Sequence, residues 1–172
     1  MNFMDLAKQR CSVRNYQNKK VEEEKLELLL EAANVAPTAA NYQSERLIVV
    51  QSENGLKKLS KGVDYHNAPM AIIVCGDHND VFVRPFDKKN MIDIDAAIVA
   101  DHIVLEAEDI GLSTCWLTYF NPDVIKYEFN IPKNIEPIAI IAVGYAASKK
   151  ASAQRHKDTR KPISSITVKE YF

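Results

Sequence analysis

Glycine is scarce in this chain, which has only five glycines among 172 residues. Their positions are Gly55, Gly62, Gly76, Gly111 and Gly144. No two lie close enough to form the Gly-x-Gly-x-x-Gly turn that binds dinucleotides, or the glycine-rich loop that cradles nucleotide phosphates. Both fingerprints are excluded, so a nucleotide cofactor would have to be held in another way.

Cysteine is equally sparse, at Cys11, Cys75 and Cys115. An odd, widely spaced set without a Cys-x-x-Cys pair is not a disulfide framework, so we expect a reducing compartment. The opening residues lack the apolar core of a signal peptide, and the longest apolar run, residues 138–147, is too short to cross a bilayer. No second ligand pair supports a metal site near Cys75. We therefore expect a cytoplasmic protein without a bound metal or a membrane partner.

An excess of positive charge is also missing, because 22 Lys and Arg face 23 Asp and Glu, for a net charge of −1. This balance argues against a general binder of nucleic acid, which needs a basic surplus, but not against a small anion held by local arginines. A hydrophobic content of 47% indicates a globular chain. The length fits one domain, with a folded surface of about 8,500 Å².

Periodicity and turn signals predict alternating helices and strands. Helices are expected at residues 5–9, 22–35, 55–61 and 92–110, and from residue 121 onward. Strands are expected at residues 47–51, 70–75, 113–118 and 137–145, and the tail residues 166–168 alternate like an edge strand. The central strands are apolar on both faces, so helices should cover both sides of one sheet. The tail strand must pair with its own sheet or with a partner subunit.

Two of four noteworthy stretches come early in the chain. Arg10 and Arg14 flank Ser12, and together they offer the planar guanidinium and hydroxyl donors that suit a phosphate. The alternative is a solvated basic patch at the end of a helix. Residues 37–43 combine small side chains with the amides of Asn41 and Gln43, which both donate and accept hydrogen bonds. The alternative there is an ordinary polar loop.

The other two stretches come later. Residues 111–117 contain the only tryptophan of the chain, which suits either a ligand site or a core strand. Residues 155–162 form a basic run, which is usually solvated. The long polar segment 77–90 is expected to be a loop with a functional role. Asp93, Asp95 and Asp101 are expected to be solvated or to cap the long helix rather than to act in catalysis.

In this order, the four stretches resemble the nitroreductase family of FMN-dependent oxidoreductases. The matching segments are RCSVRNY, APTAANYQ, DIDAAIVADHIVLEAEDIGLSTCW, and PIAIIAVGYA followed by RKP. The resemblance covers nearly the whole chain and points to the compact branch of the family. It implies an α+β fold whose mixed central sheet is flanked by helices on both faces. It also implies that residues 1–172 form a single FMN-binding domain, in an intertwined homodimer that exchanges its C-terminal strands.

The resemblance assigns the cofactor site residue by residue. Cys11 lies within the N-terminal motif, in which Arg10 and Ser12 would hold the FMN phosphate and Arg14 would lie near the pyrimidine edge of the flavin. The loop expected to lie against the isoalloxazine from the other subunit contributes Pro37, Thr38, Ala39 and Asn41. Backbone groups near flavin N5 would come from Leu117 and Thr118, and the tail arginine on the phosphate from Arg160. A lysine frequent in the family is Asp158 here, and Lys157 is the candidate replacement.

The implied reaction is a ping-pong transfer of hydride from NAD(P)H through flavin N5 to an electron-poor acceptor such as a nitroaromatic or a quinone. The chemistry lies on the flavin, so no catalytic side chain is expected; Arg14 would act as an electrostatic tuner that stabilises the reduced, anionic flavin. Two other readings remain open: a low-turnover module that binds or stores FMN, and a flavin reductase or reductive dehalogenase of the same fold.

Overall fold

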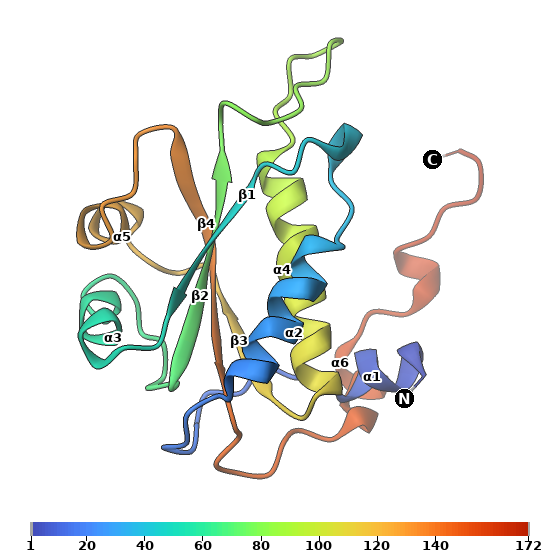
Figure 1. Cartoon of the computed structure of the whole chain (residues 1–172). Helices are drawn as coiled ribbons and strands as arrows, with labels where there is room; N and C mark the ends of the chain where they lie inside the picture. The colour runs from blue at the N-terminus through green and yellow to red at the C-terminus, as the bar shows by residue number, and fades with distance from the viewer. Residues whose placement is uncertain (1, 172) are drawn as a thin grey trace.

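In the computed structural model, which describes residues 2–171, four strands form one sheet in the order β1-β2-β4-β3 (Figure 1). The strands are β1 (Glu45–Val50), β2 (Met70–Asp77), β3 (Ser113–Leu117) and β4 (Ile135–Gly144). All of these neighbours pair antiparallel. The parallel component of the predicted mixed sheet is an isolated bridge between Ser12 and Thr114, at the outer edge of β3.

Helices cover both faces of this sheet, as the apolar strands predict (Figure 1). One face carries α2 (Glu23–Asn34) and α4 (Ile92–Asp109), and the other carries α3 (Glu53–Leu59) and α5 (Pro122–Glu128). The central strand β2 is buried along its whole length because it contributes alternate side chains to both cores, with Ile72 on the α2/α4 side and Ile73 on the α3/α5 side.

The longest helix, α4, lies directly on the sheet. Its first residue, Ile92, packs so closely on Gly76 of β2 that a Cβ at Gly76 would come within 2.2 Å of the Ile92 Cγ1. The helix ends where Gly111 adopts a φ of +78°, the left-handed conformation that glycine takes at little cost after a helix. The close contact with β2 fixes the start of α4 relative to the sheet.

The two ends of the chain meet on one side of the molecule. Helix α1 (Phe3–Gln9) is followed by a segment that joins β3, since the Val13 amide donates to the Thr114 carbonyl at 2.9 Å. The tail returns through η2 (Ala153–Arg155) and α6 (His156–Thr159), which lie beside α1 (Figure 1).

The sequence leaves two partners open for the tail strand, its own sheet or a partner subunit, and within one chain the tail does not join the sheet. Residues Ile163–Ser165 form a short 3-10 helix, and residues 166–168 are exposed and outside any strand. At the outer edge of β3, Thr114 forms an isolated bridge with Ser12. The protomer exposes 10,702 Å² of surface, about 2,200 Å² more than its mass predicts.

Among residues 2–171, no helix has the length and apolarity needed to span a bilayer.

Candidate functional site

A cavity of about 370 Å³ lies where the two ends of the chain meet. Its N-terminal wall comprises Arg10, Cys11, Ser12 and Arg14, and its tail wall comprises Arg155, His156, Thr159 and Arg160. The predicted phosphate residues from both ends of the chain are therefore brought together. No acidic side chain is among its lining residues in the described part of the chain, so the cavity has strongly positive walls.

The N-terminal wall is held by strand β3. The bridge between Ser12 and Thr114 places the motif along the edge of the sheet, while Cys11 is buried beneath it. Burial raises the pKa of the neighbouring Cys115 thiol, and the nearby Arg14 guanidinium opposes that rise. Ser12 therefore stands on the strand edge, whereas Arg10 caps the C-terminal end of α1.

The tail wall depends on Arg155. Its guanidinium donates to the backbone carbonyls of Lys8 at 3.0 Å, Arg10 at 2.6 Å and Ser152 at 3.0 Å. This clamp fastens the tail to the end of α1. In the sequence, Arg155 was visible only as one member of a basic run. Its partners are backbone atoms, which leave no pattern in the sequence.

Not every predicted tail residue contacts this cavity. Lys157 and Asp158 are exposed and are not among the described residues that line it. The neighbouring His156 lines the cavity instead, and its ring lies 3.2 Å from the Lys8 carbonyl.

A second cavity, of about 900 Å³, opens at the far end of β3. Leu117 lines it together with Tyr119, Asp64 and His66, while Thr118 is exposed beside it. The His66 ring lies 3.3 Å from the Asp64 carboxylate. Leu117 is three residues beyond the position paired with Ser12, which is about 10 Å along a strand. The two cavities therefore follow one another along the same sheet edge.

The predicted loop residues lie elsewhere. Pro37, Thr38, Ala39 and Asn41 follow the C-terminal end of α2, and neither of the two cavities along β3 includes them among its lining residues in residues 2–171. Figure 1 shows this loop at the upper end of the molecule, whereas α1 and α6 lie near the lower end of α4. Within one chain, the structure does not bring the two predicted halves of the site together.

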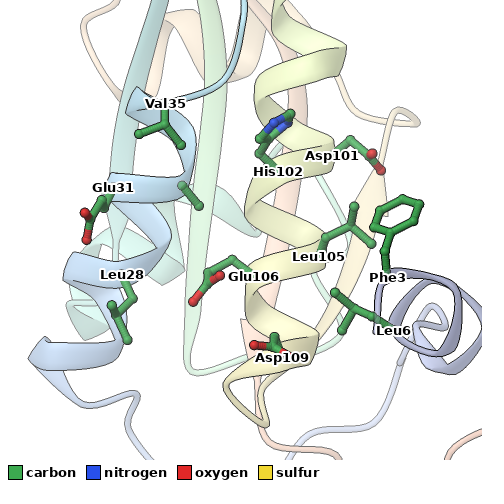
Figure 2. Close-up of a pocket in the computed structure, with 11 residues that line it drawn as sticks. Phe3, Leu6, Leu28, Glu31, Val35, Asp101, His102, Leu105, Glu106 and Asp109 are labelled. Atoms are coloured by element: carbon green, nitrogen blue, oxygen red, sulfur yellow. The ribbon is translucent and has the colours of Figure 1, made fainter. Parts of the chain in front are cut away.

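A third cavity, of about 760 Å³, lies between α1, α2 and α4. Figure 2 shows Phe3 and Leu6 of α1 beside Leu105 of α4, across from Leu28 of α2 and Val35 at its C-terminal end. Acidic side chains also line this groove, from Glu31, Asp101, Glu106 and Asp109. Burial, aided by the neighbouring Asp109 and Glu31 carboxylates, raises the pKa of Glu106. Leu28 and Val35 are exposed large apolar side chains on this surface.

The three acidic residues predicted to be solvated or capping divide into two groups. Asp93 and Asp101 are exposed, as expected, but Asp95 is fully buried. In residues 2–171, no group of three or more His, Cys, Asp or Glu side chains is arranged to hold a metal ion.

Comparison with known proteins gives matches over nearly the whole chain. A family model described as "Putative TM nitroreductase" matches residues 2–171. A solved nitroreductase family protein of Clostridium difficile 630 is 50% identical, with a TM-score of 0.98 and 100% of each chain covered. A protein of Methanothermobacter thermautotrophicus, named "Putative NADH dehydrogenase/NAD(P)H nitroreductase", is 30% identical over 155 residues, which cover 86% of this chain and 78% of that protein. A solved FMN-dependent nitroreductase of Clostridium difficile R20291 is 27% identical, with a TM-score of 0.79 and coverage of 96% of this chain and 98% of that one.

Proposed function

This chain belongs to the nitroreductase family, and on that premise we propose that it is an FMN-dependent oxidoreductase that passes hydride from NAD(P)H to an electron-poor acceptor. The names of its relatives, an NAD(P)H nitroreductase and an FMN-dependent nitroreductase, support the cofactor and the reductant. The acceptor belongs to the class of nitroaromatics and quinones, and the two half-reactions follow a ping-pong order.

The observation that carries this proposal is the positive cavity between the two ends of the chain. The guanidinium groups of Arg10, Arg14 and Arg160 line it together with the Ser12 hydroxyl. Guanidinium groups form paired, charge-assisted hydrogen bonds with phosphate oxygens. This donor set fits the FMN phosphate and does the work that a glycine-rich loop does in other nucleotide sites.

The rest of the cofactor site follows strand β3. When bound, FMN supplies the hydride chemistry at its N5 atom. Arg14 lines the phosphate cavity and is near enough to Cys115 to oppose the rise in its pKa, so it would stabilise negative charge on the reduced flavin. Leu117, at the end of β3, and Thr118, which follows it, would supply backbone groups to the flavin ring. The cavity beside Leu117 provides room for the nicotinamide or the acceptor.

The working unit is a homodimer in which each protomer, a single domain, completes the site of the other. The loop with Thr38 and Asn41 lies away from the phosphate cavity of its own chain, so it serves the partner's flavin. The surplus of about 2,200 Å² of exposed surface is of the size that a stable interface buries.

The exchanged tail of the partner occupies the groove between α1, α2 and α4. The tail residues Ile163, Ile166, Val168 and Tyr171 are exposed; Lys161 precedes them, and Lys169 and Glu170 lie between Val168 and Tyr171. The groove offers a complementary surface, with apolar walls and four acidic side chains. Apolar contact supplies affinity, and opposite charge supplies orientation.

The visible spectrum of the purified protein tests the proposal. We expect a yellow protein that carries one FMN per protomer and is bleached within seconds by NADH or NADPH under anaerobic conditions. Rapid return of colour on addition of a quinone would support acceptor reduction. A colourless protein that does not take up added FMN contradicts the proposal, whereas a yellow protein that no reductant bleaches indicates a storage module.

Sedimentation analysis tests the dimer and its tail. The full chain should sediment as a dimer, and a variant that ends at residue 162 should shift toward monomer and lose affinity for FMN. The double variant Asp101→Lys and Glu106→Lys reverses charge in the groove, and it should likewise shift toward monomer and bind FMN more weakly. A truncated variant that remains a flavin-loaded dimer would contradict the assignment of the groove.

A further inference from the structure

The loop after α2 has an unusual backbone for a segment without glycine. Ala40, Asn41 and Gln43 have φ values of 51°, 59° and 53°, in the left-handed region that side chains with a Cβ disfavour. Three such residues within four positions keep this shape only if the surrounding structure imposes it. The loop is thus held in place by contacts outside itself.

Asp95 of α4 provides those contacts. Its side chain is completely buried, and each of its carboxylate oxygens accepts a hydrogen bond from one end of the loop. The Ala39 amide donates at 2.8 Å, and the Ser44 hydroxyl donates at 3.4 Å. Asp95 therefore brackets the three left-handed residues from both sides.

The position of Asp95 suits a buried anion and a rigid anchor. It lies in the first turn of α4, where the helix dipole favours negative charge. That turn is fixed to the sheet by the close contact between Ile92 and Gly76. A buried charge is costly unless it is hydrogen-bonded, so the carboxylate and the loop amide stabilise each other's position.

Contacts within the loop complete the arrangement. The Thr38 hydroxyl accepts a hydrogen bond from the Gln43 amide at 3.0 Å, which closes the loop on itself. The Tyr42 ring stacks edge-on against Phe82 at 5.8 Å and so joins the loop to the segment that precedes α4. None of these contacts reaches the charged cavity on the other side of the molecule, and each leaves Asn41 exposed toward solvent or a partner.

We propose that Asp95 is the positioning residue of the flavin-facing loop: it holds Thr38, Ala39 and Asn41 in the one backbone shape that can lie against the isoalloxazine ring. This inference rests on the proposed function, because it assigns the loop to the flavin of the partner subunit. Asp95 touches neither flavin nor substrate in this scheme, and it acts only through the loop backbone.

The inference predicts a specific pattern of ligand binding. A loop that contacts the ring and not the phosphate should affect FMN and riboflavin equally. If loss of the carboxylate leaves the competent loop shape populated about a tenth of the time, both dissociation constants rise about tenfold. Asp95→Ala should show this loss, and Asp95→Asn should show a smaller one, because its amide oxygen can still accept from the Ala39 amide.

The experiment combines flavin titration with amide hydrogen exchange on the intact dimer. Fluorescence quenching gives the dissociation constants of FMN and riboflavin, and exchange reports the protection of the Ala39 amide without added flavin. Ser52→Ala is the matched control, because it removes the hydroxyl that accepts from the Gly55 amide at the start of α3, away from the loop. The control should keep wild-type flavin affinities and wild-type protection at Ala39.

Each outcome bears on the inference. Equal weakening of both ligands, with faster exchange confined to residues 38–44, supports it. Unchanged affinities in folded Asp95→Asn and Asp95→Ala overturn it, as does weakening of FMN alone. Should Asp95→Ala fail to fold, the Asn variant decides by the same measurements. A wild-type protein that binds neither flavin overturns the proposed function and this inference with it, whereas a wild-type protein that binds both confines any failure to the role of Asp95.

Discussion

The clamp made by Arg155 gives the sharpest test of the phosphate site. Its guanidinium makes three hydrogen bonds to backbone carbonyls, including those of Lys8 and Arg10, and these bonds hold the tail wall of the cavity in place. Arg155→Ala removes all three bonds and a positive charge. The tail, which carries Arg160, should then spend less time beside Ser12.

The size of the effect follows from the geometry. A hydrogen bond from a charged donor contributes about 1.5–3 kcal/mol when considered alone. Arg155 is half-exposed and its three bonds are not independent, so we assign about 2 kcal/mol to the whole clamp. At about 1.4 kcal/mol per factor of ten, the dissociation constant of FMN should rise about 30-fold.

Flavin fluorescence titration with two ligands separates this effect from general damage. Riboflavin lacks the phosphate, so its affinity should be the same for Arg155→Ala and for the wild type. Arg155→Lys keeps the positive charge but loses the planar guanidinium, so its FMN affinity should lie between those of Arg155→Ala and the wild type. Equal loss of FMN and riboflavin affinity would refute the reasoning, as would an unchanged affinity for FMN.

Three other substitutions test the electrostatics of the bound flavin, the packing of the core and the loss of stability at low pH. Arg14→Ala should lower the midpoint potential of bound flavin in a redox titration, and an unchanged potential would contradict its role. Gly76→Ala should lower the free energy of unfolding by about 1–3 kcal/mol, which corresponds to about 2–4 °C in Tm for each kcal/mol. Because the new methyl group would meet the Ile92 side chain, the same substitution should cost less stability in an Ile92→Ala background. Hydrogen bonds from Tyr145 and Lys19 lower the pKa of Glu22 from 4.5 to about 2. The contribution of ionised Glu22 to the free energy of unfolding is thus complete above pH 4.5 and is lost as the pH falls toward 2. In acid denaturation, Glu22→Gln should therefore be less stable than the wild type at pH 7, and the two stabilities should become equal near pH 2.

Much of the fold could be predicted because its signals are local. The helical period of α2 is visible in the chain, and so is the start of α5, where the Asn121 side chain accepts from two amides and Pro122 follows at the first helical position. The tail is a different case, because a strand also needs a partner edge, and within residues 2–171 of one chain residues 166–168 pair with no strand. No local pattern could reveal that Ser12 occupies the edge of β3 at Thr114.

The candidate site was only partly visible for a similar reason. Side chains that repeat in a family motif, such as Arg10 and Arg160, could be predicted, and the structure places both on one cavity. Arg155 and Asp95 were missed as functional candidates, because their partners are largely backbone groups. One signal for Asp95 was present: it stands with Ile92, Ala96 and Val99 on the buried stripe of α4, where a solvated carboxylate would not be expected.

If the cavity holds FMN, as proposed, the clamp between the two ends of the chain also determines when the cofactor can be captured during synthesis. Arg155 and the Arg10 carbonyl are 145 positions apart in the sequence. A nascent chain can form β1, β2 and α4 while its last residues are still within the ribosome, but the phosphate cavity must wait for the tail to emerge. Incomplete chains would then be unable to retain FMN through this cavity, and cofactor retention would mark the chains whose synthesis has reached the tail.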